Sequence, residues 1–370
     1  MHKTKIIYLS PVGFFKGGAE RSLFDLVDNP AVEAIMLAPE DDTILEKARS
    51  LGLAHEVLPF GSINTIHRPF SFMKGFRAVN DLLKAALKLK AISKETGANI
   101  VHSNGLKAHM INCVSSRLGG AKSVLHIRDI PYTKPEILIW KIMHTLCYKM
   151  ILVSHACWPA DALPRKAVVI HNGTPLVDID RGQNNKDSND MTIGFVGRIH
   201  PGKGLHLLVD WLAAARGKGM DVRLSVRGTF SEDAPTYEDE IKAQIETLGM
   251  GDYVEFTGFI HDAQTLYRGL NVVVVPSKAP DPLPRSVMES MARGIPVFGY
   301  PAGGIFEMIE DGKTGYLVDS AQSFVASLEK VSGDQAVLDN MMQAAREKIE
   351  REFTIEGLHQ GVSDIYTSLS

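Results

Sequence analysis

Short apolar runs alternate with stretches of helical periodicity along the whole chain. This alternation predicts α/β units built on parallel sheets. The continuous run Val272–Val275 favours a strand that is covered on both faces. In the first half the strand-like runs are 5–10, 33–39, 55–60, 99–104, 122–128, 150–155 and 167–173, and the helix-like stretches between them include 19–28, 75–96, 105–118 and 137–148. In the second half the strand-like runs are 191–197, 222–228, 253–259, 271–277, 296–300 and 315–318.

The chain length predicts two domains. A chain of 370 residues is long enough to build two separate cores. The segment 178–190 has almost no large apolar side chains, so we expect a linker or exposed loop there. Residues 334–369 show helical periodicity with one break near Phe353–Thr354, and this tail is expected to pack back onto the first domain. The predicted division is 1–175, 176–350 and a returning helix over 351–370.

Composition narrows the class of protein. A hydrophobic fraction of 45% with 22% charged residues is ordinary for a globular protein. No segment reaches the roughly 18–20 apolar residues that span a bilayer, and the start of the chain, MHKTKIIYLSP, lacks the pattern of a signal peptide. Cys113, Cys147 and Cys157 have no C-x-x-C spacing and are expected to be buried thiols. We therefore expect a cytoplasmic protein.

Charge is divided unevenly between the two halves. Residues 1–175 hold 22 Lys and Arg against 14 Asp and Glu, whereas residues 176–370 hold 18 against 29. Within 68–94 basic and apolar side chains lie together: Arg68, Lys74, Arg77, Lys84, Lys88, Lys90 and Lys94, with Phe70, Phe72, Met73 and Phe76. Two interpretations stay open, contact with an anionic membrane surface at the inner face of the membrane and the solvated face of an ordinary helix. Nucleic acid is not expected as a partner, because the chain is acidic overall and shows no binding motif.

The segment 272–296, VVVVPSKAPDPLPRSVMESMARGIP, carries the first candidate chemistry. Asp281 lies on the loop after a predicted buried strand, and Glu289 lies on the predicted helix that follows. Both carboxylates can therefore face the crevice beyond the edge of the sheet. In open α/β sheets, ligands bind in that crevice.

The segment 194–205, GFVGRIHPGKGL, carries the second candidate chemistry. A predicted strand ends at Gly197, and Arg198 and Lys203 flank a Gly/Pro turn before a predicted helix. Such a turn brings backbone N–H groups and a helix N-terminus toward a phosphate, which Arg and Lys side chains also bind. A basic surface turn is the alternative interpretation, because the glycine spacing matches neither the dinucleotide fingerprint nor the P-loop.

Several motifs in a fixed order resemble the family 4 retaining glycosyltransferases. They are VGRIHPGKG, FTGFIHD, VVVPS followed by D-x7-E-x-M-A-x-G-x-PV, and GG-x-x-E-x-I-x-DG-x-TGYLV, which together span nearly all of 191–320. The first half matches more weakly, through FFKGGAERSLFDLV (14–27), NIVHSNGLKAH (99–109), HIRDIP (126–131), VSHA (153–156) and VIHNG (169–173). The resemblance implies the GT-B fold, two Rossmann-like doubly wound domains that face a central cleft. The first domain would bind the acceptor and the second a nucleotide sugar.

The resemblance also implies roles for individual residues. Arg198 and Lys203 match the basic pair that holds the donor diphosphate. Glu289 matches the residue that binds the ribose hydroxyls, and Asp281 matches the acidic position that faces the donor sugar. The other matched positions are expected near the donor or at the domain connection: Gly17, Gly18, Gly197, Ser277, Gly303, Gly304 and Asn172–Gly173.

The sequence departs from the family pattern in its first acidic motif. The family usually has Glu-Gly-Phe-Gly where this chain has Asp281-Pro282-Leu283-Pro284. Asp is one methylene shorter than Glu, and each Pro removes a backbone donor. Leu283 and Arg285 keep their N–H groups, which we expect to remain available for donor contacts.

The second departure lies in HIRDIP. The family often has a His-Asp step here, with the His beside the reacting sugar; in this chain Arg128 and Asp129 take those two places. His126 lies two positions earlier and therefore shares a face of the strand with Arg128. Either His126 or Arg128 is thus a candidate to line the cleft. Two other histidines are weaker candidates: His102, and His109, which is expected at the surface or behind the site.

The resemblance implies transfer of a sugar from a nucleoside diphosphate to a glycan or lipid-linked acceptor, with retention at the anomeric carbon. The basic pair would stabilise the departing diphosphate, so no metal, no cofactor and no protein base are expected. Two further hypotheses are weighed: a non-catalytic subunit that binds the donor within a glycan assembly complex, and a sugar-nucleotide epimerase, for which the sequence has no motif. The donor base, the sugar and the oligomeric state stay open.

Overall fold

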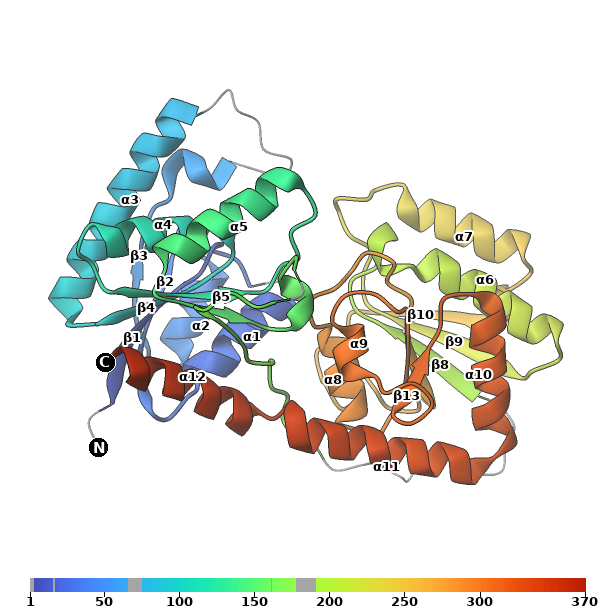
Figure 1. Cartoon of the computed structure of the whole chain (residues 1–370). Helices are drawn as coiled ribbons and strands as arrows, with labels where there is room; N and C mark the ends of the chain where they lie inside the picture. The colour runs from blue at the N-terminus through green and yellow to red at the C-terminus, as the bar shows by residue number, and fades with distance from the viewer. Residues whose placement is uncertain (1–2, 16, 66–74, 161, 178–190) are drawn as a thin grey trace. The chain divides into compact units, whose positions relative to one another are not determined.

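The computed structural model describes residues 3–15, 17–65, 75–160, 162–177 and 191–370. The predicted linker 178–190 lies outside the described residues, as do the members of the basic segment between Arg68 and Lys74. The chain divides into two compact units, each with its own sheet (Figure 1). Unit 1 comprises residues 1–173 together with 355–370, and unit 2 comprises 174–354.

Unit 1 is built on a seven-stranded parallel sheet with the strand order β3-β2-β1-β4-β5-β6-β7. Its strands are β1 (Thr4–Leu9), β2 (Val32–Ala38), β3 (Ala54–Val57), β4 (Ile100–Asn104), β5 (Lys122–Ile127), β6 (Lys149–Leu152) and β7 (Ala167–Val169). The strand order reverses between β1 and β4. Asn104, the last residue of β4, therefore lies beside the point of reversal.

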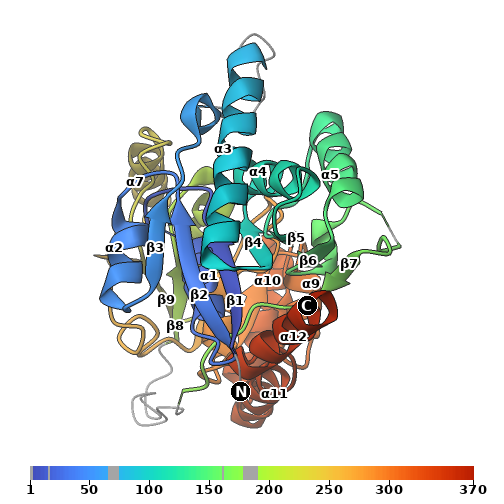
Figure 2. The ribbon, with the colours of Figure 1, turned by 90° about the vertical axis from the view of Figure 1, so that its left-hand side faces the viewer.

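Helices cover both faces of this sheet. On one face α1 (Gly18–Val27), α2 (Thr43–Ser50) and α12 (Ile355–Leu369) share a core with β1 and β2. On the other face α3 (Gly75–Thr96) and α4 (Leu106–Arg117) pack on the sheet, and α5 (Lys134–Leu146) contacts α4 (Figure 2). This double cover explains the continuous apolar strands.

The C-terminal helix belongs to unit 1, as the sequence predicts. Leu358, Val362 and Tyr366 recur every fourth residue, so they form one apolar stripe on α12. All three side chains are buried in the core cluster that contains Tyr8 of β1. Burying such side chains stabilises the helix by roughly 1.5–3 kcal/mol each before entropy is counted.

Unit 2 is built on a six-stranded parallel sheet with the order β10-β9-β8-β11-β12-β13. Its strands are β8 (Met191–Val196), β9 (Val222–Arg227), β10 (Val254–Gly258), β11 (Val272–Val275), β12 (Val297–Gly299) and β13 (Gly315–Leu317). Its helices are α6 (Leu205–Gly217), α7 (Tyr237–Thr247), α8 (Arg285–Met291), α9 (Ile305–Met308), α10 (Ala321–Gly333) and α11 (Gln335–Glu352). Here the strand order reverses between β8 and β11.

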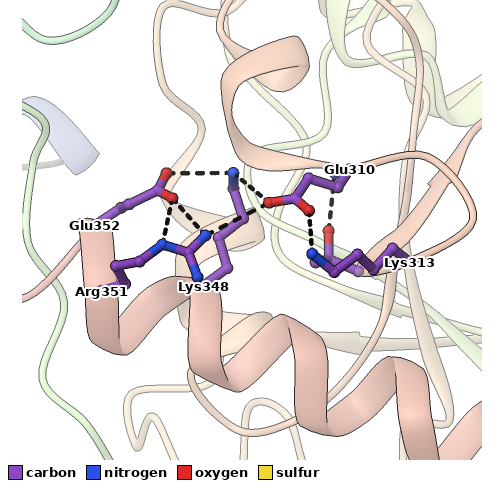
Figure 3. A network of polar contacts seen from close by, with 6 residues as sticks. Glu310, Lys313, Lys348, Arg351 and Glu352 are labelled. Atoms are coloured by element: carbon purple, nitrogen blue, oxygen red, sulfur yellow. Dashed lines mark hydrogen bonds and ion pairs between the residues drawn. The ribbon is translucent and has the colours of Figure 1, made fainter.

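A charged network holds the end of α11 against the loop before β13 (Figure 3). Lys348 Nζ lies 3.1 Å from Glu310 Oε1 and 3.2 Å from Glu352 Oε2. Lys313 Nζ lies 2.8 Å from Glu310 Oε2, and Arg351 contacts both carboxylates. Hydrogen bonds from the two lysines lower the pKa of Glu310 to about 2. The helix ends at Glu352 and α12 begins at Ile355, so the predicted break at Phe353–Thr354 is confirmed.

Candidate functional site

The candidate residues of unit 2 lie on loops at the carboxyl ends of neighbouring strands. Gly197 and Arg198 follow β8 directly, whereas Ser277 and Asp281 lie on the loop after β11. Glu289 lies on α8, the helix that this loop leads into. Because β8 and β11 adjoin where the strand order reverses, these residues occupy the place where open α/β sheets bind ligands.

Two glycines allow these loops to pack against one another. Gly204 has φ 77°, and a Cβ atom there would lie 2.1 Å from the Pro276 carbonyl oxygen. Gly303 has φ 60°, and a Cβ atom there would lie 2.3 Å from the Asp281 carbonyl oxygen. The next residue, Gly304, donates its N–H to that same Asp281 oxygen at 2.9 Å. Only glycine fits both the backbone conformation and the space at these two positions.

Lys203 and Asp281 form an ion pair. The short 3₁₀ turn Pro201–Lys203 places Lys203 Nζ 2.5 Å from Asp281 Oδ2. The other carboxylate oxygen, Oδ1, accepts the N–H of Leu283 at 3.2 Å. Without a ligand this N–H is therefore used within the loop, because the short Asp side chain reaches back to it; a contact of Leu283 with the donor stays a prediction. A phosphate at Lys203 would compete with Asp281.

Arg198 contacts a different acidic residue. Its Nη1 lies 3.1 Å from Ser231 Oγ and 3.4 Å from Asp233 Oδ2, and the side chain is 61% exposed. The hydrogen bond from Ser231 is the main cause that lowers the pKa of Asp233. The sequence analysis missed Ser231 and Asp233. They follow β9, the strand beside β8. Their position after the carboxyl end of a predicted strand is the signal that could have identified them.

The Glu289 carboxylate is held from two sides. Arg285 Nε lies 3.1 Å from Oε1, and the Tyr267 hydroxyl lies 2.9 Å from Oε2. Burial raises the pKa of Tyr267 well above its usual value, so its hydroxyl stays protonated and donates. Each carboxylate oxygen keeps a second lone pair for a ligand hydroxyl. Arg285 and Tyr267 therefore orient Glu289. The sequence contains no motif that marks Tyr267.

Ser277 has an unsatisfied hydroxyl. It is buried, and its Oγ has no hydrogen-bond partner among the described residues. Buried polar atoms are rarely left unpaired unless a water or ligand completes them. Ser277 is therefore a group of unit 2 that is open to a ligand at the predicted site.

The glycine positions of unit 1 begin a helix. Gly17 caps the N-terminus of α1, and Gly18 is its first residue. The Gly17 N–H donates to Glu20 Oε2 at 2.7 Å. The Glu20 side chain therefore occupies the Gly17 N–H. The resemblance implies that this glycine loop lies near the diphosphate and the acceptor.

Arg128 is bound to acceptors of its own unit. Its Nε donates to Asn104 Oδ1 at 2.7 Å, its Nη1 donates to Asn172 Oδ1, and its Nη2 lies 3.4 Å from the Ser22 carbonyl oxygen. The guanidinium thus joins the ends of β4 and β5 to α1. It also joins them to Asn172, which lies next to Gly173, the last residue of the first segment of unit 1.

His126 is buried and keeps one ring nitrogen unpaired. Its Nδ1 lies 3.0 Å from His102 Nε2, and within the part of the chain that the structure describes its Nε2 has no hydrogen-bond partner. Burial, followed by the charge of Arg128, lowers the pKa of both histidines well below 6.5, so both are neutral near pH 7. His109 is also buried, with Nδ1 2.9 Å from Ser103 Oγ. A surface position for His109 is therefore wrong.

Three wider expectations concern the whole chain. All three cysteines are buried, as predicted. Among the residues that the structure describes, no His, Cys, Asp and Glu side chains form a group of three or more that could hold a metal ion. Within the same residues, every helix is too short or too polar to cross a bilayer.

Residues 177–348 match the family model of the glycosyl transferases group 1. This part of the chain is similar to the group 1 glycosyltransferases. The matched region contains every candidate residue of unit 2, from Gly197 to Gly304. The network around β8 and β11 therefore lies within the region that resembles the group 1 glycosyltransferases.

The curated relatives match about half of the chain. A putative glycosyltransferase of Bacillus subtilis, YtcC, is 30% identical over 47% of this chain and 44% of its own length. A putative colanic acid biosynthesis glycosyltransferase of Salmonella typhimurium, WcaL, is 25% identical over 56% of this chain and 52% of its own length. The chain thus spans about half the length of the curated relatives it matches.

The similarity of fold extends over the whole chain. The crystal structure of Anabaena HepE in complex with UDP matches with a TM-score of 0.84 and 22% identity, over 99% of this chain and all of that one. A second structure of that protein, in complex with UDP-glucose, matches with a TM-score of 0.80. The chain therefore has the GT-B fold that the motifs predict.

Proposed function

We propose that this chain is a retaining, family 4 glycosyltransferase that moves a sugar from a nucleoside-diphosphate sugar to a glycan or lipid-linked acceptor. Unit 2 would bind the donor and unit 1 the acceptor. HepE binds UDP and UDP-glucose, which supports a nucleotide sugar as the ligand class. The name of WcaL supports a role in the synthesis of cell-surface polysaccharide.

One observation carries the proposal: Lys203 and Arg198 lie on the loop after β8, at the point where the strand order reverses, and Lys203 contacts Asp281 of the loop after β11. Two cations on neighbouring loop positions suit a diphosphate. Glu289, fixed by Tyr267 and Arg285, would accept hydrogen bonds from the ribose hydroxyls.

Charge development explains how such a site would accelerate transfer. Breaking the anomeric C–O bond builds positive character on the sugar and negative charge on the diphosphate. Arg198 and Lys203 would stabilise that leaving group, and one such donor in a dry site is worth about 3–4 kcal/mol of barrier. Under front-face attack the departing phosphate oxygen takes the acceptor proton. The proposal therefore assigns the leaving-group charge to side chains and needs no metal, cofactor or protein base.

A peripheral contact with an anionic membrane is part of the proposal. On α3, Val79, Leu83 and Leu87 recur every fourth residue and are 65%, 45% and 47% exposed. The same helix carries an excess of basic residues, and α5 exposes further apolar side chains. An exposed apolar stripe beside basic residues fits the surface of an anionic bilayer. The enzyme would then act at the cytoplasmic face of the membrane, where lipid-linked acceptors are held.

The test is a transfer assay with the variants Arg198→Ala and Lys203→Ala. Each is expected to lower kcat/KM by about a hundredfold or more with the protein still folded. Lys242→Ala is the matched control, because Lys242 is also paired with a carboxylate of unit 2 but lies on α7. Full activity of both Arg198→Ala and Lys203→Ala would refute the assignment of these two residues to the diphosphate. Activity that persists after removal of divalent ions supports the metal-independent part.

The donor-binding subunit is the competing function, and the motif Asp281-Pro282-Leu283-Pro284 is the observation that favours it. A thermal-shift screen with nucleoside diphosphates and their sugars identifies the ligand, because binding to the folded form alone raises its stability. A donor that binds, but is neither hydrolysed nor transferred to any acceptor, would support the non-catalytic subunit.

A further inference from the structure

Several polar side chains of unit 1 share one face of the sheet. Tyr8 is the register partner of His102, and Asn104 is the register partner of His126. His102 and Asn104 lie two positions apart on β4, so all four side chains project from the same face. This is the face covered by α12, whose Tyr366 lies in the same core as Tyr8.

These side chains form one continuous hydrogen-bonded chain. The Tyr8 hydroxyl lies 3.4 Å from the Leu26 carbonyl oxygen and 3.2 Å from the Tyr366 hydroxyl. The Tyr366 hydroxyl lies 2.6 Å from His102 Nδ1, and His102 Nε2 lies 3.0 Å from His126 Nδ1. The two tyrosine hydroxyls and the two neutral imidazole rings each have one proton to donate, whereas the Leu26 carbonyl can only accept.

Counting protons fixes the direction of this chain. All four contacts are filled only if Tyr8 donates to Leu26, Tyr366 donates to Tyr8, His102 Nδ1–H donates to Tyr366, and His126 Nδ1–H donates to His102. In the opposite direction the contact between Tyr8 and the Leu26 carbonyl would have no proton, although this carbonyl still accepts the N–H of Asn29 at 3.3 Å. His126 would then bury an N–H without an acceptor. His126 Nε2 is therefore left as a bare acceptor, and it is the ring atom without a partner.

The neighbouring Asn104 is fixed in the complementary sense. Its Oδ1 faces Arg128 Nε at 2.7 Å, and a guanidinium can only donate, so the amide cannot be turned around. Its Nδ2 is consequently a donor, and no described residue provides a hydrogen-bond partner for this buried atom. A buried donor and a buried acceptor thus lie on adjacent strands beside the point where the strand order of unit 1 reverses.

We propose that Asn104 and His126 bind one hydroxyl group of a sugar, which donates to His126 Nε2 and accepts from Asn104 Nδ2, and that Tyr366 of the C-terminal helix is the positioning residue that fixes His126 as an acceptor. A hydroxyl group donates and accepts through the same oxygen atom, as this pair of contacts requires. That this hydroxyl belongs to a sugar rests on the proposed function; the direction of the hydrogen-bonded chain does not. The returning helix α12 thus sets the chemistry of a substrate contact as well as covering the sheet.

Nitrogen NMR of the free protein tests the positioning role. Correlation spectra of the imidazole nitrogens distinguish the two neutral tautomers, and His126 is expected to carry its proton on Nδ1. In Tyr366→Phe, His102 loses its acceptor, so the tautomer with the proton on Nε2 should appear at His126. Val362→Ala is the matched control, because it removes packing from α12 without removing an atom of the chain, and it should keep the wild-type tautomer. Two results would overturn the positioning role of Tyr366. One is a wild-type His126 that carries its proton on Nε2. The other is a His126 that carries its proton on Nδ1 both in the wild type and in Tyr366→Phe.

Binding measurements test the hydroxyl site and its source. Asn104→Asp keeps the acceptor for Arg128 and replaces the donor with an oxygen, so the variant should fold. It is expected to weaken the sugar-bearing ligand about tenfold while binding of UDP alone is unchanged. The UDP-glucose titration reports a hydroxyl of the donor sugar, and methyl glucoside added with UDP reports a hydroxyl of the acceptor. If Asn104→Asp binds the ligand as tightly as the wild type in both titrations, then Asn104 Nδ2 and His126 Nε2 hold only water, and the proposal is overturned. If the wild-type protein binds no nucleoside diphosphate, the proposed function fails, and the NMR result still decides the role of Tyr366; if it binds one other than UDP, the same titrations are made with that nucleotide and its sugar.

Discussion

Lys203 Nζ and Asp281 Oδ2 lie 2.5 Å apart, although the two residues are separated by 78 positions in the chain. The pair joins the loop after β8 to the loop after β11. The proposed diphosphate ligand and the Asp281 carboxylate would therefore compete for the same ammonium group. Asp281 pairs with Lys203 in the structure without a ligand; under the proposed function it would release Lys203 when the diphosphate binds.

Asp281→Asn is expected to separate binding from transfer. The variant frees Lys203 and removes a negative charge, so the affinity for a nucleoside diphosphate should rise by up to about fivefold, the worth of a partly exposed ion pair. Sugar transfer should fall if Asp281 also orients the donor sugar. Titration calorimetry and a transfer assay measure the two effects. Glu238→Gln is the matched control, since it breaks an ion pair on α7 with the same change in net charge. Weaker nucleotide binding in Asp281→Asn would contradict the competition.

Tyr267→Phe tests how Glu289 is oriented. The hydroxyl of Tyr267 is one of the two groups that hold the Glu289 carboxylate, and its loss leaves a largely buried charged oxygen short of a donor. We expect a loss of about 1–3 kcal/mol in the free energy of unfolding and a higher KM for the donor. Tyr237→Phe also removes a hydroxyl that is hydrogen-bonded within unit 2. It should cost stability without changing the KM of the donor. An unchanged KM in Tyr267→Phe would separate Glu289 from donor binding.

Glu310 gives the stability of unit 2 a dependence on acid pH. Its pKa is about 2 in the folded protein against an ordinary value of 4.5, so the folded form binds fewer protons between these values. The stabilisation is therefore complete above about pH 4.5 and is lost as the pH falls toward about 2. Because Glu310 is 36% exposed, solvent screening limits the effect to about 1 kcal/mol.

Glu310→Gln should remove this dependence. At pH 7 the variant should be less stable than the wild type, because Lys348 is nearly buried and loses one of its two carboxylates. The two proteins should approach equal stability as the pH falls toward 2. Urea unfolding across this pH range gives the comparison. A constant difference at every pH would show that the charge of Glu310 is not the cause.

The exposed stripe of α3 gives a prediction about membranes. Replacing Val79, Leu83 and Leu87 by serine should reduce sedimentation with phosphatidylglycerol vesicles while leaving the fold intact, because these side chains are already exposed. Leu51→Ser is the control, since Leu51 is an exposed leucine next to α2 on the opposite face of the sheet. Equal sedimentation of wild type and triple variant would favour the solvated-helix interpretation.

Particular residues show how far sequence reasoning reached at the site. The apolar run before Pro276 and the break at Phe353–Thr354 were predictable, because strand burial and helix ends are written in local patterns. Local spacing placed Arg198 and Lys203 after a strand, as observed. It could not show that Lys203 contacts Asp281. Nor could it show that Leu283 uses its N–H within the same loop.

The sequence by itself determined the two α/β units, their elements and the loops that carry the candidate chemistry, because these follow from the periodicity of neighbouring residues. Only the tertiary structure decided the state of the functional groups. His102 meets Tyr366 across 264 positions, and Glu289 meets Tyr267 across 22. The protonation and orientation of a buried side chain depend on the donors and acceptors around it, and the fold brings those from distant parts of the chain.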